Sequence, residues 1–221
     1  VDVVSKVVSI QVGQVRAWGA EFASASQEAA ETTAIFKTAV AGPVEAKELG
    51  LAGDQQADLR HHGGRDKAVL GYAAAHYSLW KQEYDWPELE YGGFGENLTI
   101  DDCDEQAACV GDVYRLGDAL LQVSQPRQPC GKLNRRWGRS DLVKLVLQLG
   151  RSGWYFRVVQ PGLIAPGDLE LVERPHPEWT IVRCHDVFLN RKSSQRREEA
   201  RELSQLAPLA QAWKEDLDAD L

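Results

Sequence analysis

Short apolar runs, each ended by glycine or a polar turn, follow one another through residues 1–174. Most of them are four to eight residues long and rich in valine, isoleucine and aromatic residues, which is typical of strands rather than helices. The pair Gly117-Asp118 lies between two alternating segments and predicts a tight hairpin. The expected strands are residues 7–15, 34–40, 67–72, 96–100, 112–125, 154–162 and 167–173.

Helical periodicity is confined to a few segments. Residues 73–84 carry apolar side chains at helical spacing, and residues 141–149 do so behind Ser140, the expected N-cap. The two prolines of "ERPHPEW" mark a change of composition near residue 175, after which three short helical patterns replace the strands. We therefore expect a mainly β fold with helices (α+β): a barrel domain over 1–174 and a small three-helix domain over 175–221.

Charge and composition limit the classes of partner. The formal net charge is −8, which disfavours binding to nucleic-acid phosphates, since such binding depends on dense lysine and arginine. The tail from His176 onward has seven basic and nine acidic residues, so its helices are not expected to bind DNA. No apolar run reaches the roughly 18 residues of a membrane span. The alternating N-terminal segment is unlike a signal peptide, and the four cysteines form no CxxC pair, so a reducing cytoplasm is the expected location.

The densest polar cluster is "GLAGDQQADLRHHGGRDKAV", residues 50–69. Glycine turns can present backbone N–H groups to an anion, and Arg65 and Lys67 could add charged hydrogen bonds. The cluster has neither the Walker nor the dinucleotide spacing, and a simple polar hairpin is an equal interpretation. His61 and His62 are adjacent and should point to opposite faces of an extended chain, so a shared zinc ion is not expected.

Two further positions could carry chemistry. In "GFGENLTI", Glu96 and Asn97 could fix a ligand edge or could equally satisfy the N–H groups of their own loop. In "SQPRQPC", Pro126 and Pro129 stiffen the approach to Cys130. Nearby cations favour the thiolate, and of the four cysteines Cys130 has the most basic surroundings.

In combination, "GLAGDQQAD…HHGGRDKAV", "GENL" and "GDVYRLGDALLQVSQPRQPC" resemble the MOSC family, the domain found at the C-terminus of molybdenum cofactor sulfurases and in stand-alone bacterial proteins. The order, the spacing and the terminal cysteine agree over roughly residues 40–135. The helical tail resembles the small domain of one bacterial branch. The resemblance implies a mostly β barrel that binds the molybdenum cofactor, a pterin dithiolene with molybdenum and a terminal phosphate.

The resemblance also implies roles for particular residues. Cys130 stands where relatives have the cysteine that binds molybdenum or handles its sulfur. Thiolate is a suitable soft ligand for such a metal. Arg127, Arg65 and Lys67 would meet anionic groups of the cofactor. The full set of expected cofactor-binding residues is His62, Gly63, Gly64, Arg65, Lys67, Glu96, Asn97, Ser124, Arg127 and Asn134.

Stand-alone members of the family are linked to the reduction of N-hydroxylated compounds such as hydroxylamino nucleobases, so the resemblance implies a molybdenum-dependent reductase. The chain has no flavin, nicotinamide or iron–sulfur fingerprint, so a separate protein is expected to donate the electrons. The alternative is a carrier of the cofactor or a sulfur-transfer module that uses a persulfide on Cys130. The tail could dock an electron donor, cover the pocket or serve as a structural cap.

Overall fold

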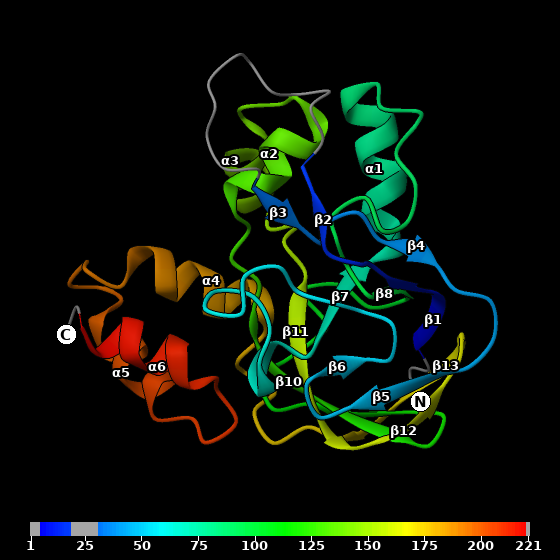
Figure 1. Ribbon diagram of the computed structural model, residues 1–221. Helices are drawn as coiled ribbons and strands as arrows, with labels where there is room; N and C mark the ends of the chain where they lie inside the picture. Colours follow the sequence, from blue (N-terminus) through cyan, green and yellow to red (C-terminus); the bar gives the residue numbers. More distant parts are fainter. Residues whose placement is uncertain (1–4, 19–30, 220–221) are drawn as a thin grey trace.

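The computed structural model describes residues 5–18 and 31–219. The segments 1–4, 19–30 and 220–221 of the two expected domains lie outside the described residues. Seven strands of the described chain form a closed barrel in the order β13-β9-β10-β11-β7-β8-β1, and β1 pairs with β13 to complete the ring (Figure 1). The expected mainly β fold with helices is confirmed. The barrel strands are β1 (Ser5–Val12), β7 (Val69–Ala73), β8 (Leu98–Asp101), β9 (Val113–Leu116), β10 (Ala119–Pro126), β11 (Trp154–Gln160) and β13 (Gly167–Glu173).

The remaining strands are short and lie at the margins of the barrel. A three-stranded sheet has the order β12-β5-β6, β2 pairs with β3, and β4 extends the barrel beside β1. These strands are β2 (Arg16–Ala17), β3 (Thr32–Thr33), β4 (Thr38–Ala39), β5 (Val44–Lys47), β6 (Gly50–Leu51) and β12 (Gly162–Ile164). The strand expected over residues 34–40 is therefore mostly wrong, since only Thr38 and Ala39 are paired. The hairpin at Gly117-Asp118 is confirmed, with Leu116 opposite Ala119.

Three helices gather at one end of the barrel (Figure 1): α1 (Ala74–Tyr84), α2 (Gly131–Trp137) and α3 (Leu142–Gln148). Helix α1 connects β7 to β8, which run parallel, because a parallel pair needs a crossover of this kind. The three helices share an aromatic core that includes Trp80, Trp86 and Phe94.

Ser140 is not the N-cap of α3, and that expectation is wrong. The helix begins at Leu142, and the Asn134 side chain accepts the Val143 N–H at 2.7 Å while it donates to the Ser140 carbonyl at 2.8 Å. An amide one helix away thus satisfies the free N–H that Ser140 was expected to cap.

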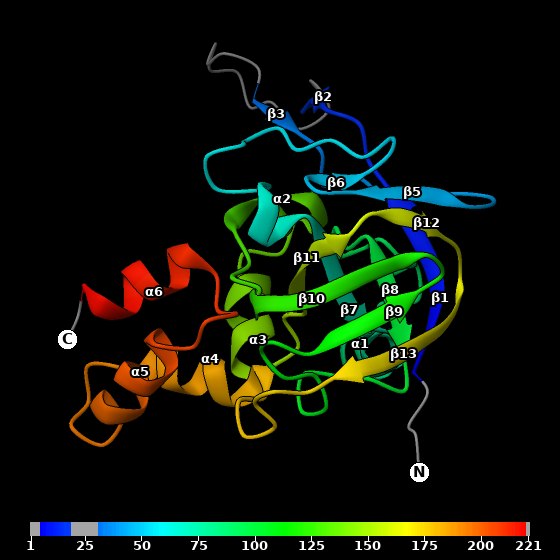
Figure 2. The same cartoon turned by 90° about the horizontal axis from the view of Figure 1, so that it is seen from below.

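The three tail helices lie beside the barrel in both views (Figures 1 and 2). They are α4 (Ile181–Asn190), α5 (Arg197–Ser204) and α6 (Gln211–Asp218), as the helical patterns predict. Their buried side chains, such as Trp213 and Leu217, belong to the same apolar cluster as the barrel interior. No helix in the described part of the chain is both long enough and apolar enough to cross a bilayer.

Candidate functional site

The loop that carries Cys130 is held at both ends. Strand β10 ends at Pro126, and the next residue, Arg127, donates its backbone N–H to the Gly153 carbonyl at 3.0 Å. Cys130 itself is extended (φ −112°, ψ 167°), and its carbonyl accepts the Leu133 N–H at 3.0 Å in the first turn of α2. The half-buried thiol is therefore placed by a rigid strand-to-helix connection. A stiff loop of this kind keeps its side chain at one position in the absence of a ligand.

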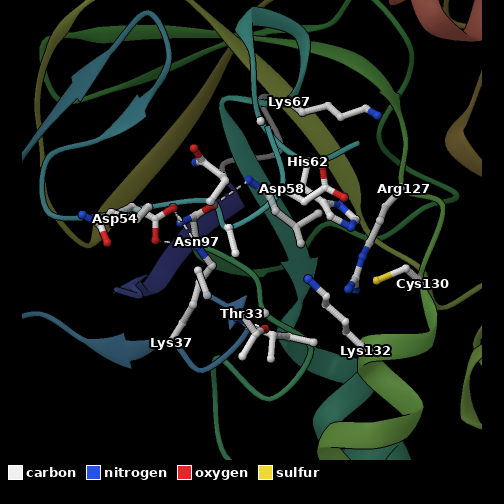
Figure 3. A pocket seen from close by; sticks show the side chains of 18 of the residues that line it. Thr33, Lys37, Asp54, Asp58, His62, Lys67, Asn97, Arg127, Cys130 and Lys132 are labelled. Atoms are coloured by element: carbon white, nitrogen blue, oxygen red, sulfur yellow. Dashed lines mark hydrogen bonds and ion pairs between the residues drawn. The ribbon is translucent and has the colours of Figure 1, made fainter. Parts of the chain in front are cut away.

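A cavity of about 680 Å³, counted to its open mouth, lies in front of this loop (Figure 3). The thiol of Cys130, the guanidinium of Arg127 and the ammonium of Lys132 face the same space (Figure 3). The structure brings six of the expected residues to this cavity: His62, Gly63, Lys67, Asn97, Arg127 and Cys130.

Arg127 is the most informative side chain of the cavity. It is only 6% exposed, and its Nη1 atom has no hydrogen-bond partner among the described residues. A buried guanidinium nitrogen without a partner is costly, because its N–H groups have lost their water and gained no hydrogen bond in return. An anionic ligand in the cavity would remove that cost.

The 58–67 loop supplies the opposite wall. Burial lowers the pKa of His62 to about 4, and the charges of Arg127 and Lys67 add to the effect. The imidazole is therefore neutral at pH 7, with one N–H to donate and one nitrogen to accept. Lys67 donates from Nζ to the His61 carbonyl at 2.9 Å, and burial lowers the pKa of its ammonium group. His61 lines the adjoining outer pocket and pairs with Asp58 at 2.9 Å, so the two histidines do have different surroundings.

A buried ion pair forms the back wall. Lys37 Nζ lies 2.6 Å from both carboxylate oxygens of Asp54, and the two side chains are 8% and 0% exposed. Asp54 also accepts the Gly13 N–H at 2.7 Å and the Asn97 Nδ2 at 2.9 Å. Asn97 also accepts the Leu70 N–H at Oδ1 and donates to the Gln11 carbonyl, so both N–H groups of its amide are used within the wall.

Five expected residues lie outside the cavity. Glu96 is fully buried, accepts the N–H groups of its own loop and bonds the Tyr77 hydroxyl. Ser124 donates to the carbonyls of β11 and of the 58–67 loop, and Asn134 joins α2 to α3. Gly64 and Arg65 line a neighbouring cleft.

Fourteen of the twenty residues that line the cavity were not among the expected set, including Lys37, Asp54, Lys132 and Tyr155. Asp54 stands inside the quoted glycine-rich motif, and Lys132 lies two residues after Cys130 in the sequence. Lys37 had one available signal, a lone charge inside the apolar run "AIFKTAV". No feature of the sequence singles out Tyr155, because aromatic residues are common in strands.

The other three cysteines are buried, and burial makes their thiols less acidic than a free thiol. Burial raises the pKa of Cys103 to about 12 and that of Cys109 to about 11, and it also raises the pKa of Cys184. These thiols stay protonated at neutral pH and are poor nucleophiles. Within the described ranges, no three His, Cys, Asp or Glu side chains are grouped so that they could hold a metal ion.

A family model and several known proteins match the chain. The MOSC domain family matches residues 58–169, which contain the 58–67 loop and Cys130. The chain is 46% identical to the uncharacterized protein YflK of Bacillus subtilis (strain 168) over 143 residues, 64% of either chain. It is 40% identical over 167 residues to a protein of Gibberella moniliformis named "Reductase", a match that covers 74% of this chain and 30% of that protein.

Both curated matches span less than two thirds of the relative's length. The solved structure of YiiM from Geobacillus stearothermophilus covers more: it superposes with a TM-score of 0.80 at 34% identity, over 98% of this chain and 99% of that one. The barrel, the cysteine loop and these matches together show that the chain belongs to the MOSC domain family.

Proposed function

We propose that this protein is a molybdenum-cofactor-dependent oxidoreductase that reduces N-hydroxylated compounds, with Cys130 as the protein ligand of molybdenum. Membership of the MOSC family and the relative named "Reductase" support an oxidoreductase. The chemistry of the cavity supports the choice of cofactor.

The observation that carries the proposal is the pairing of the half-buried Cys130 thiol with the buried, unpartnered Nη1 of Arg127 in one cavity. The molybdenum cofactor combines a soft metal with an anionic phosphate, and the cavity offers a soft ligand and a cation without a counter-charge. Cys130 would bind the metal, and Arg127 would bind an anionic group. The donor set of the cavity therefore fits the cofactor.

The cofactor supplies a two-electron couple able to remove the oxygen of an N–OH group. The net reaction is R–NHOH + 2e⁻ + 2H⁺ → R–NH₂ + H₂O, so the site must also deliver two protons. Lys67 and Lys132 line the cavity and the adjoining outer pocket, where their ammonium groups can supply protons and stabilise negative charge. Neutral His62 can donate a hydrogen bond to the substrate without adding charge.

The electrons would come from a separate protein, since the chain carries no second redox fingerprint. The match to the "Reductase" covers 30% of that protein, so most of that chain lies outside the match.

The test is elemental analysis for molybdenum on protein from a host that makes the cofactor. We expect near-stoichiometric molybdenum that is lost in Cys130→Ala and retained in Cys103→Ala, a matched control at a buried thiol. Turnover of an N-hydroxylated base with a chemical reductant then tests the reaction. Loaded protein without turnover would favour the carrier or sulfur-transfer alternative, and protein without molybdenum would refute the proposal.

A further inference from the structure

A second, basic cleft adjoins the cavity between the 60–67 loop and α6. It has a volume of about 1080 Å³, counted to its open mouth. One acid, Asp66, lines it together with five cations: Arg60, Arg65, Lys67, Arg157 and Lys214. Such an excess of cations is notable in a chain whose net charge is −8, because solvated surface charges of this protein are mostly acidic.

The single acid of the cleft is already neutralised. Asp66 pairs with the Arg157 guanidinium at 2.8 Å, and its other oxygen accepts the Gln211 N–H at 3.2 Å. Ala210 donates to the Ser124 carbonyl at 2.9 Å. These bonds fix the start of α6 against the barrel, so the two walls of the cleft keep their separation.

Several donors of the cleft are free to bind a ligand. The Arg60 guanidinium has no hydrogen bond or ion pair within the described chain, and neither do the backbone N–H groups of Gly63 and Gly64. Lys214 has only a long contact, 3.4 Å, with a backbone carbonyl. Acids do lie nearby: Glu48 pairs with Arg65 at the surface, and Asp216 partly offsets the charge of Lys67. A multiply charged anion would still find more cations than acids here.

The cleft and the cavity adjoin each other and share lining residues. Gly63 and Lys67 line both, and Gln125 joins the cleft to the outer pocket that reaches Cys130. A ligand with one end at Cys130 can therefore extend past Lys67 into the cleft. Inside the cavity, Arg127 is available for the cofactor's own phosphate, which leaves the cleft for a second anion.

We propose that the cleft binds the phosphoryl group of the substrate, so that the preferred substrate is a phosphorylated, nucleotide-like compound whose N-hydroxylated base lies at Cys130. This inference rests on the proposed function for the identity of the base. The phosphoryl chemistry has two possible sources, a substrate and the terminal phosphate of the pterin, and the experiment separates them.

The first arm needs neither cofactor nor turnover. Binding of inorganic pyrophosphate to cofactor-free protein is measured by calorimetry for the wild type and for Arg60→Gln/Lys214→Gln. Each charged contact to phosphate contributes about tenfold in affinity, so we expect about 100-fold weaker binding in the double variant. Arg115→Gln/Lys144→Gln removes the same charge from exposed positions away from the cleft and should bind like the wild type. Equal weakening in both variants, or no binding to the wild type, would overturn the proposal.

The second arm identifies which molecule supplies the phosphoryl group that binds in the cleft. In cofactor-loaded protein, Arg60→Gln/Lys214→Gln should raise the KM for an N-hydroxylated nucleotide about 100-fold, leave the KM for the free base unchanged and leave the molybdenum content unchanged. A fall in molybdenum content would assign the cleft to the pterin phosphate and overturn the substrate assignment. If the proposed reductase activity is itself absent, the pyrophosphate arm still decides whether the cleft is a phosphoryl site.

Discussion

The buried pair of Lys37 and Asp54 gives a sharp test of the architecture of the site. Asp54→Asn keeps the shape of the side chain but removes its charge. The carboxylate now accepts from Lys37, Gly13 and Asn97, all within 2.9 Å. An asparagine would present one oxygen and one NH₂ group to the same three donors. At least one of the three would therefore face the NH₂ group, which is itself a donor.

The burial of the pair sets the expected magnitude. Exposed ion pairs are worth at most about 1 kcal/mol, whereas breaking a fully buried pair costs about 3–5 kcal/mol. Side-chain exposures of 8% and 0% place this pair in the second class. We expect Asp54→Asn to lower the free energy of unfolding by about 3–5 kcal/mol at pH 7, a large part of the ~5–15 kcal/mol of an ordinary domain.

The pH dependence has a definite sign. Burial lowers the pKa of Lys37 below its usual 10.5, although Asp54 opposes the shift. Without Asp54 the pKa of Lys37 should fall further. Between the folded pKa and 10.5 the unfolded chain binds more protons than the folded one, so stability rises with pH in this window. In Asp54→Asn that window should extend to lower pH.

Urea unfolding followed by tryptophan fluorescence at pH 7 and pH 9 measures both effects. The double variant Lys37→Met/Asp54→Asn should lose less stability than Asp54→Asn alone, because no charge is left buried. Glu83→Gln, which removes an exposed partner of Arg151, is the control and should change stability by less than about 1 kcal/mol. A loss below about 1 kcal/mol in Asp54→Asn, or a double variant as unstable as the single one, would refute the reasoning.

Three further results are expected. Iodoacetamide should alkylate the native protein at Cys130 and not at the three buried thiols, so Cys130→Ser should abolish labelling seen by mass spectrometry until urea is added. Burial lowers the pKa of His185, which is 5% exposed, to about 4, so the free energy of unfolding should fall as the pH is lowered from 6.5 to 4. In His185→Leu this fall should be smaller by about 3 kcal/mol, as measured by unfolding at a series of acidic pH values. Gly153→Ala should destabilise the fold by more than about 1 kcal/mol, because its φ is +78° and a new Cβ would clash with the Gly71 carbonyl. An unchanged thermal midpoint would contradict this last expectation.

The sequence predicted the local elements whose signals are short-range. The Gly117-Asp118 hairpin, helix α1 and the three tail helices needed only alternation, periodicity and turn chemistry. Helix α2 was missed, because its seven residues are mostly polar or basic. Its stability comes from distant contacts such as the 2.8 Å bond from the Trp137 indole to the Gly93 carbonyl. The N-cap expected at Ser140 was also wrong because of a contact between separate segments: the side chain of Asn134, six residues earlier, accepts the Val143 N–H instead.

The order of the motifs was enough to identify the family, and the basic residues beside Cys130 were enough to select it as the candidate cysteine. Which polar side chains lie around Cys130 is known only from the tertiary structure. Arg127 is buried with its Nη1 atom lacking a hydrogen-bond partner, whereas the Glu96 carboxylate accepts hydrogen bonds from its own loop. Lys37 and Asp54 are 17 positions apart and form a buried pair in the folded structure. Hydrogen-bond partners and burial are set by packing between segments distant in the chain, and no local pattern of residues encodes them.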